Sequence, residues 1–119
     1  MELPRDAVLL RIFVEEADEY AGEALFRKIV LKAREMNLAG ATALRGALGF
    51  GRSGELHASS IFHPPTSASI VVEIVDTEQK IQGFLAAAED IVGSRLVTLE
   101  KVQAIFYKGE SSDRPRPGF

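Results

Sequence analysis

The chain contains no cysteine and no tryptophan, and it has only two histidines and two methionines. Without cysteine there is no disulfide bond, no thiolate nucleophile and no zinc–thiolate site. The net charge of −3 lacks the basic excess that nucleic-acid-binding proteins usually display. No apolar run approaches the roughly 20 residues of a membrane-spanning helix, and the first residues do not form a signal peptide. These absences favour a cytoplasmic protein that is not inserted in a membrane and binds no nucleic acid.

What is present indicates a single globular domain. The 119 residues are 46% apolar and 26% charged, which suits one core and is too short for two. We expect the domain to span residues 1–108. The segment 109–119 combines charge, serine, proline and glycine, and we expect it to be disordered.

The hydrophobic pattern alternates between strand and helix periods along the chain. Apolar residues recur every second position in 7–14, on the side of Val8, Leu10, Ile12 and Val14. The stretch 15–22 is expected to be a turn, and the helical period then runs over 23–36, with a left-handed stop at Asn37. The later elements are expected to be a second strand over 41–48, a central strand covered on both faces over 69–76, a helix ending at Gly93, and a last strand region over 96–107 that is kinked near Glu100. We expect Asp76 or Thr77 to cap the second helix, with Gln79 completing a capping box after Asp76.

This order of elements predicts an α+β fold, a ferredoxin-like βαββαβ sandwich with a long loop between strands 2 and 3. In such a sandwich the helices cover one face of an antiparallel sheet, and the other face has no cover within the chain. The alternation places apolar side chains on one common set of strand positions, at Leu9, Phe13, Val71, Val75 and Ile105. A patch of this size is rarely left exposed to water, so we expect self-association across the open face.

The long loop holds the residues that are most suggestive of a binding site. Gly49, Phe50 and Gly51 form a Gly-Phe-Gly sequence that is followed directly by Arg52. Glycines allow backbone N–H groups to approach a phosphate closely, and the arginine could pair with phosphate oxygens. The alternative interpretation is an ordinary strand end with a flexible loop. For Arg45 and Glu73, which lie in predicted strands, the alternative to ligand binding is an ion pair at the surface or at a subunit interface.

The two histidines, His57 and His63, give weak support for chemistry. Their spacing matches no strong metal-ligand pattern, and no nucleophile and base are arranged as catalysis requires. We therefore predict no catalytic residue, no metal and no enzymatic activity. The alternatives are a small oligomeric enzyme of the same fold that uses His57, and an interaction module that binds no ligand.

Two segments resemble the PII signal-transduction proteins. GATALRGALGFGRSGELH, residues 40–57, is similar to the second strand and the T-loop entry of that family, and IVVEIVDTEQ, residues 70–79, is similar to the third strand and the start of its second helix. The likeness extends over essentially the whole chain and is strongest to a PII-like branch whose members have no defined function.

This resemblance implies a homotrimer with its sheets facing inward, ATP or ADP bound in clefts between subunits, and a T-loop that contacts a transporter, channel or enzyme. It implies that Gly49, Phe50, Gly51 and Arg52 border the nucleotide, that Glu73 lies near the adenine, and that Arg95 stands at the end of the phosphate loop. His57 and Arg45 complete the candidate ligand residues. The glycine-rich phosphate loop of the family is reduced here to VGSRLV, and the T-loop lacks the tyrosine that the family modifies. A regulatory protein that senses a small metabolite, with no cofactor, is the predicted function.

Overall fold

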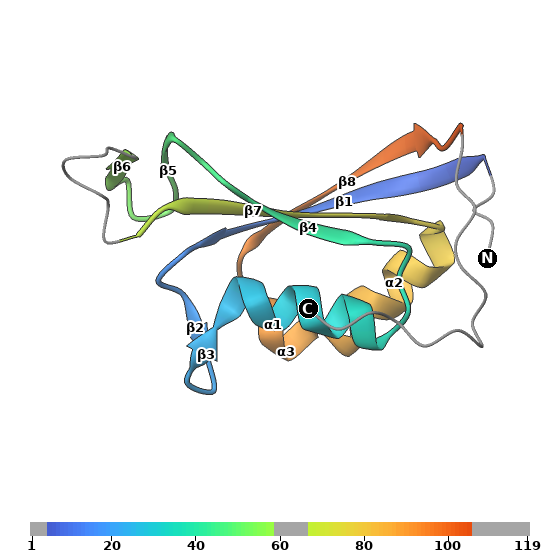
Figure 1. Cartoon of the computed structure of the whole chain (residues 1–119), viewed down its shortest axis with the longest axis horizontal. Coiled ribbons are helices and arrows are strands. Elements are labelled where there is room, and N and C mark those ends of the chain that lie inside the picture. The colour runs from blue at the N-terminus through green and yellow to red at the C-terminus, as the bar shows by residue number, and fades with distance from the viewer. Residues whose placement is uncertain (1–4, 59–66, 106–119) are drawn as a thin grey trace.

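A computed structural model of the chain describes residues 5–58 and 67–105. The four long strands are β1 (Asp6–Glu15), β4 (Ala41–Arg45), β7 (Ser69–Asp76) and β8 (Leu96–Gln103). They form one antiparallel sheet in the order β4-β7-β1-β8. The helices α1 (Leu25–Glu35), α2 (Glu78–Ala87) and α3 (Glu89–Val92) all lie on one side of this sheet (Figure 1). The predicted ferredoxin-like fold class is confirmed.

The hydrophobic core fills the space between the sheet and the helices. On β1 the residues that the alternation predicts are buried, Ala7 is buried as well, and Leu10 and Ile12 have no exposed surface at all. The apolar residues predicted on one side of each helix are buried against this strand and against β7. The core residues are Val8, Leu10, Ile12, Val14, Leu25, Ile29, Ala33, Leu38, Ile70, Val72, Ile74, Ile81, Phe84, Ala88 and Val92. Each large side chain buried in this way contributes about 1.5–3 kcal/mol to stability.

The helix boundaries agree with the sequence signals in part. Asn37 adopts the predicted left-handed conformation after α1, with φ at 59°, and Gly93 ends α3 with φ at 61°. The second predicted helix is divided into α2 and α3, because the backbone at Ala88 departs from helical geometry. The turn predicted over 15–22 does not extend over the whole segment, because the last residues of the segment form part of a short hairpin.

The expected capping box at the start of α2 is wrong. Thr77 is the cap, and its hydroxyl accepts a hydrogen bond from the backbone N–H of Lys80 at 3.1 Å. Asp76 is instead fully buried, and its carboxylate accepts hydrogen bonds from the backbone N–H groups of Ala39 at 2.8 Å and Thr77 at 2.7 Å. The carboxylate therefore joins the loop before β4 to the start of α2.

The predictions for three of the strands need correction. The expected kink near Glu100 is absent, because β8 pairs continuously with β1 from Asp6↔Gln103 to Phe13↔Leu96. This strand ends at Gln103, so Ile105 is not part of the sheet. The second predicted strand is shorter than expected, because β4 stops at Arg45. β7 lies inside the sheet, but the helices of the chain cover only one of its two faces.

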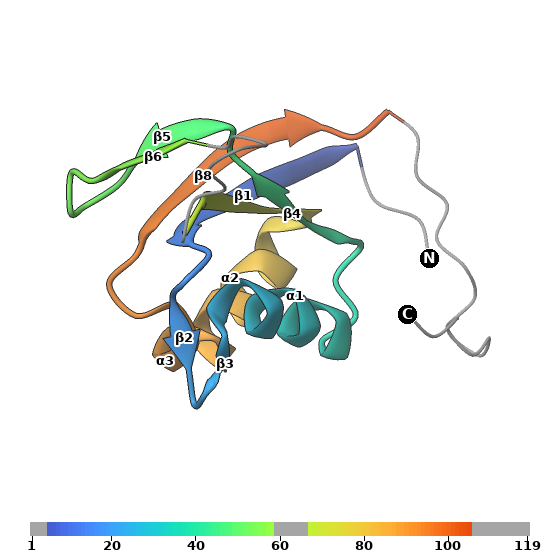
Figure 2. The same ribbon diagram turned by 60° about the vertical axis from the view of Figure 1, so that its left-hand side comes forward.

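Two hairpins extend from the sandwich. The first consists of β2 (Glu19–Tyr20) and β3 (Glu23–Ala24), with Ala21 and Gly22 both at positive φ in the turn. The second consists of β5 (Leu48–Phe50) and β6 (Leu56–Ala58), and it rises on the side of the sheet away from the helices (Figures 1 and 2). The first part of the expected long loop is thus an ordered hairpin. Residues 59–66, with His63, and the expected disordered segment 109–119 lie outside the described residues, and the division at residue 108 stays a prediction.

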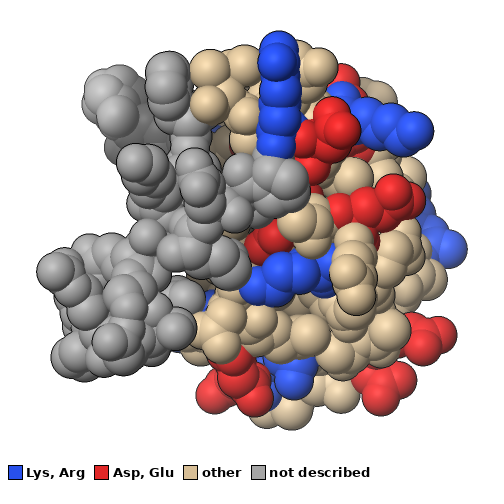
Figure 3. Space-filling view, turned by 90° about the vertical axis from the view of Figure 1, so that its right-hand side faces the viewer, with Lys and Arg blue, Asp and Glu red and all other residues tan. Residues whose placement is uncertain are grey.

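Charged side chains of both signs are intermingled over the described surface at the end of the molecule where α2 begins (Figure 3). Within residues 5–58 and 67–105, no helix has the length and apolar character needed to cross a bilayer.

Candidate functional site

The sheet face opposite the helices, which we call the open face, carries a largely apolar surface. The strand registers place Leu9, Val75, Phe13 and Val71 side by side in cross-strand pairs at its centre, as the alternation predicts. These side chains are half-buried within the single chain. Leu44 on β4 and Leu96 on β8 extend the surface to both edges and are 48% and 62% exposed.

An ion-pair network crosses the middle of the open face. Arg11 on β1 donates from Nε to Glu73 Oε2 at 2.9 Å, and from Nη1 to Glu100 Oε2 at 3.1 Å. The side-chain hydrogen bond to Glu73, and then the one to Glu100, raise the pKa of Arg11. One guanidinium therefore links β7, β1 and β8, and the network retains one uncompensated negative charge.

The antiparallel topology brings four chain segments to one end of the sheet, at the left of Figure 1. β1 and β4 end there, and β7 and β8 begin there, as the pairs Glu15↔Ser69, Arg45↔Ile70 and Phe13↔Leu96 record. The segments are residues 15–18, 45–54, 67–69 and 93–96. Three arginines, Arg45, Arg52 and Arg95, lie on these segments, and we call them the arginine cluster.

Each arginine of the cluster has an internal partner. Arg52, in the turn of the β5–β6 hairpin, donates from Nη1 to Ser94 Oγ at 3.0 Å. Arg95, next in sequence to that serine, places Nε 3.5 Å from Asp18 Oδ2. Arg45 forms an ion pair with Glu16. The hairpin, the turn before β8 and the turn after β1 are thereby linked through charged side chains.

The two carboxylates come from one tight turn, residues 15–18, which we call the acidic turn. The backbone N–H of Asp18 donates to Glu15 O at 3.0 Å, and the Asp18 carboxylate accepts from the Glu15 N–H at 2.9 Å. The turn is held to the start of β7 by Glu16 N–H to Ala68 O at 2.7 Å and by Ala17 N–H to Ser67 Oγ at 3.0 Å. These hydrogen bonds fix both carboxylates opposite the arginines.

Glycines allow the close approach of the hairpin to β7. A Cβ added at Gly49 would lie 2.9 Å from Ser69 Oγ, and one added at Gly46 would lie 3.3 Å from Ser69 O. Gly93 has φ at 61° and ψ at −134°, and a Cβ there would lie 3.2 Å from Arg95 Nη1. Only glycine adopts this backbone conformation readily, so Gly93 sets the path of the chain into Ser94 and Arg95.

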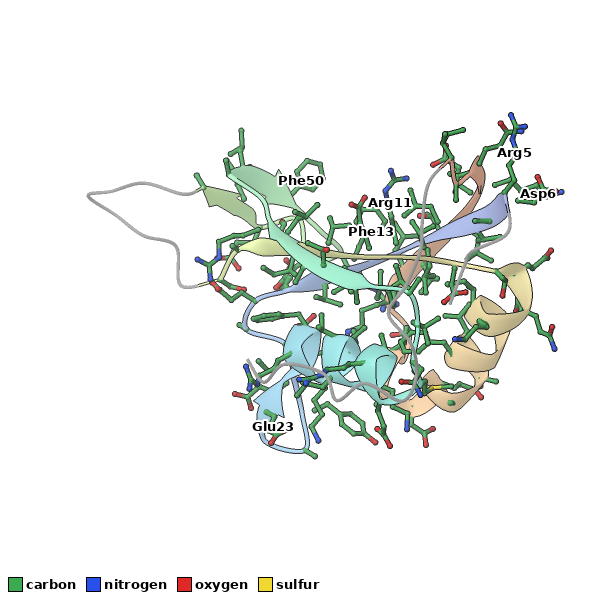
Figure 4. All side chains as sticks on the ribbon, turned by 45° about the vertical axis from the view of Figure 1, so that its right-hand side comes forward. Arg5, Asp6, Arg11, Phe13, Glu23 and Phe50 are labelled. Carbon is green, nitrogen blue, oxygen red and sulfur yellow. The ribbon has the colours of Figure 1, made fainter. Side chains whose placement is uncertain are left out.

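The β5–β6 hairpin presents an apolar side to solvent. Leu48, Phe50 and Leu56 lie on the same side of it by register and are 66%, 71% and 64% exposed. The side chain of Phe50 lies above the same side of the sheet as that of Arg11 (Figure 4). The apolar side of the hairpin therefore adds to the apolar surface of the open face.

The structure brings together some of the predicted site residues. Arg45, Gly49, Gly51, Arg52 and Arg95 lie at the same end of the sheet, and a Cβ at Gly51 would contact Glu15 Oε1 at 3.6 Å. Phe50 lies on the adjoining hairpin, and His57 pairs with Gly49 in β6. Glu73 lies three positions beyond Ile70 on β7, and its carboxylate bonds Arg11 instead of joining the arginine cluster. In the described part of the chain, no three His, Cys, Asp or Glu side chains gather as metal ligands would.

Sequence reasoning missed several partners of these residues. Glu16, Asp18 and Ser94 were not candidates, nor was Arg11 on the open face. The run of acidic residues after the first strand was a visible signal for Glu16 and Asp18, because carboxylates at a strand end lie near the ends of neighbouring strands. Nothing local to Arg11 or Ser94 distinguishes them from ordinary surface residues.

The fold belongs to the PII-like class of ferredoxin-like proteins. The structure of CPII from Thiomonas intermedia, a nitrogen regulatory PII-like protein, matches with a TM-score of 0.60 over 83% of this chain and 88% of that chain, at 16% identity. CPII was determined bound to ADP and bicarbonate, and in a second structure to ADP, AMP and bicarbonate. At this identity the likeness concerns the fold alone.

The family is defined by sequence. Residues 7–104 match the model of DUF190, the family described as Uncharacterized ACR, and the chain is a member of that family. A UPF0166 protein of Aquifex aeolicus is 38% identical over 100 residues, which cover 82% of this chain and 92% of the relative. A UPF0166 protein of Methanocaldococcus jannaschii is 26% identical over 106 residues, which cover 88% of this chain and 95% of the relative. The predicted membership of a PII-like branch without defined function is confirmed.

Proposed function

We propose that this protein is a PII-like regulator that binds a small anionic metabolite, with an adenine nucleotide as the leading candidate. The ligand binds at the arginine cluster, in clefts between the subunits of a homotrimer. Binding is communicated to a partner protein, such as a transporter, channel or enzyme, through the T-loop-like segment 50–67. The observation that carries this proposal is the position of Arg45, Arg52 and Arg95 at the same end of the sheet, each held by a residue from another of the segments that meet there.

The arginine cluster suits an oxyanion ligand. Guanidinium groups have donors arranged to match phosphate or carboxylate oxygens, and they remain protonated at every physiological pH. The glycines beside them let backbone N–H groups approach the ligand. Because Arg52 belongs to the hairpin and Arg95 to the sandwich, a ligand that contacts both changes how the hairpin is held.

The proposed clefts arise where neighbouring subunits associate across the open face. Half-buried apolar side chains at Leu9, Phe13, Val71 and Val75 provide a hydrophobic driving force for self-association. The ends of the sheet then lie at the rim of the interface, where a neighbouring subunit can complete a cleft beside the arginine cluster. The resemblance to the PII proteins, which implies a homotrimer, supports the trimer as the form of this assembly.

An adenine nucleotide is the leading candidate because CPII, with the same fold, binds ADP. The function is regulatory and not enzymatic, since PII-like proteins are regulators, and we place the protein in the cytoplasm. The candidate ligand residues Gly49, Phe50, Gly51, His57 and Glu73 act beside the arginine cluster in this proposal, with Glu73 reached across a subunit interface.

Thermal shift with ATP, ADP, AMP and cyclic nucleotides, followed by calorimetry of each hit, tests the proposal. A ligand at about 100 times its dissociation constant adds about 2.7 kcal/mol to the free energy of unfolding, which is readily detected. Arg52→Ala should abolish the shift and leave the assembly intact. Arg27→Ala, on the solvent side of α1, is the matched control and should retain the shift. A nucleotide shift that persists in Arg52→Ala, or silence of the wild type towards every nucleotide, would overturn the proposal.

A further inference from the structure

The β5–β6 hairpin has one side that faces its own chain and one side that does not. Gly49 lies on the first side, because a Cβ added there would lie 2.9 Å from Ser69 Oγ at the start of β7. Side chains alternate along a strand, so Leu48 and Phe50 point the other way. The apolar side of the hairpin, which also holds Leu56, is therefore directed away from the strand of its own chain that lies beneath it.

The hydrogen bonds that hold the hairpin to its own chain lie outside this apolar side. Gly46 N–H donates to Ser69 O at 2.7 Å, and Arg52 Nη1 donates to Ser94 Oγ at 3.0 Å. None of the described residues of β5 and β6 is part of the hydrophobic core. An isolated two-stranded hairpin is only marginally stable in water, and it becomes more stable when a hydrophobic side packs against another element. Within the described residues of one chain, the apolar side of this hairpin lacks such packing.

The apolar side of the hairpin is too small to form a stable interface alone. Leu48, Phe50 and Leu56 are each about two-thirds exposed, and together they present on the order of 300 Å² of apolar surface. A stable interface between proteins buries about 800 Å² on each partner. The apolar side of the hairpin is therefore expected to be covered as part of a larger surface.

The larger surface next to the hairpin is the open face. The row of side chains at this end of the open face is apolar on all four long strands, as the pairs Leu44↔Val71, Phe13↔Val71 and Phe13↔Leu96 record. Phe50 lies above the same side of the sheet (Figure 4). A copy of the chain that covers this row also meets the hairpin, because the row and the hairpin form one apolar surface.

We propose that the apolar side of the β5–β6 hairpin packs against a second copy of the chain, so that the neighbouring subunit holds the beginning of the T-loop-like segment. This inference rests on the proposed self-association across the open face, and it adds the hairpin to that interface. Arg52 lies in the turn of the same hairpin. A ligand that engages Arg52 in one subunit thus acts on a contact with the next subunit, which links ligand binding to the association of subunits.

Two substitutions on the hairpin test its part in the interface. Leu48→Ser and Leu56→Ser should each weaken association of the full chain about tenfold, because the exposed two-thirds of a leucine side chain no longer gains from burial. Leu31→Ser is the matched control, at a leucine on the solvent side of α1 that is 43% exposed, and it should associate as the wild type does. Sedimentation equilibrium measures all four proteins.

Amide hydrogen exchange of the wild type tests the packing of the hairpin directly. When the oligomer is diluted until it dissociates, the amides of residues 48–58 should exchange more than about tenfold faster. The β2–β3 hairpin, residues 19–24, lies on the helix side of the sheet and is the internal control (Figure 1). Its amides should exchange at the same rate in the oligomer and in the monomer.

Faster exchange of the β5–β6 hairpin on dissociation, together with weaker association of Leu48→Ser and Leu56→Ser, would support the inference. An oligomer whose β5–β6 hairpin exchanges as fast as in the monomer, and whose association neither substitution changes, would place the hairpin outside the interface and leave the proposed function standing. A wild type that is monomeric at every concentration would reject both this inference and the proposed assembly. The thermal shift with nucleotides would then still decide ligand binding.

Discussion

Whether further copies of the chain cover the open face can be tested with two leucines that are similarly exposed in the isolated chain. Leu44 lies on the open face and is 48% exposed, and Leu31 lies on the solvent side of α1 and is 43% exposed. Each is changed to glutamate. In a monomer both substitutions are ordinary surface changes, worth at most about 0.5 kcal/mol of stability. In an assembly that covers the open face, only Leu44→Glu introduces a charge into an apolar interface.

The size of the expected effect follows from burial and charge. Full burial of a leucine side chain contributes about 1.5–3 kcal/mol, so covering the exposed half of Leu44 contributes about 1 kcal/mol per protomer. An unpaired carboxylate in the same place adds a desolvation penalty of several kcal/mol. The sum exceeds about 3 kcal/mol per protomer, and association should weaken more than about a hundredfold.

Sedimentation equilibrium and concentration-dependent melting measure this effect directly. The wild type and Leu31→Glu should sediment as the same oligomer, and their melting temperatures should rise with protein concentration. Leu44→Glu should sediment as a monomer at the same concentrations. A monomeric wild type, or an oligomer that survives Leu44→Glu, would refute the reasoning that the open face is covered by further copies of the chain.

Two further predictions concern the sandwich itself. Asp76→Ala should lower the free energy of unfolding by about 2–4 kcal/mol, because the backbone N–H groups of Ala39 and Thr77 each lose a hydrogen-bond acceptor; a change below about 0.5 kcal/mol in urea denaturation would contradict this role. Ala21→Asn should raise the melting temperature by about 2–6 °C, because Ala21 has φ at 52° in a two-residue turn that favours Asn-Gly. An unchanged or lower melting temperature would show that the strain at this alanine is relieved in another way.

The period of the hydrophobic pattern predicted the sandwich correctly, because the alternation between buried and exposed positions extends along the whole length of a strand or helix. The buried side of β1, the span of β7 and the stops at Asn37 and Gly93 all follow from such local signals. The β5–β6 hairpin was missed because its strands are only three residues long, too short for alternation to be recognised. The kink expected near Glu100 was wrong because a charged residue in a strand can face the open side and pair with Arg11.

The candidate site was less predictable than the fold. Arg52 could be suggested as a ligand residue because it follows Gly51 in an irregular segment, and Arg95 because the resemblance to PII proteins implies that it ends the phosphate loop. The partners of both arginines depend on strand order. Asp18 and Arg95 are brought together only because β1 ends where β8 begins, and no local sequence signal encodes that proximity. Glu73 illustrates the same limit, because its partner Arg11 lies on a strand that is far from β7 in the sequence.

The strand order has a consequence for synthesis on the ribosome. Among the strands of residues 5–58 and 67–105, β1 pairs only with β7 and β8, and β4 pairs only with β7. Neither of the first two long strands therefore has a partner in the main sheet until residue 69 has been made. The nascent chain must therefore keep the apolar sequence of β1 from pairing elsewhere while more than half of the protein is translated. The sheet can then close only after the last strand has left the exit tunnel. Folding should accordingly be late and cooperative, and truncated chains that lack β7 should aggregate.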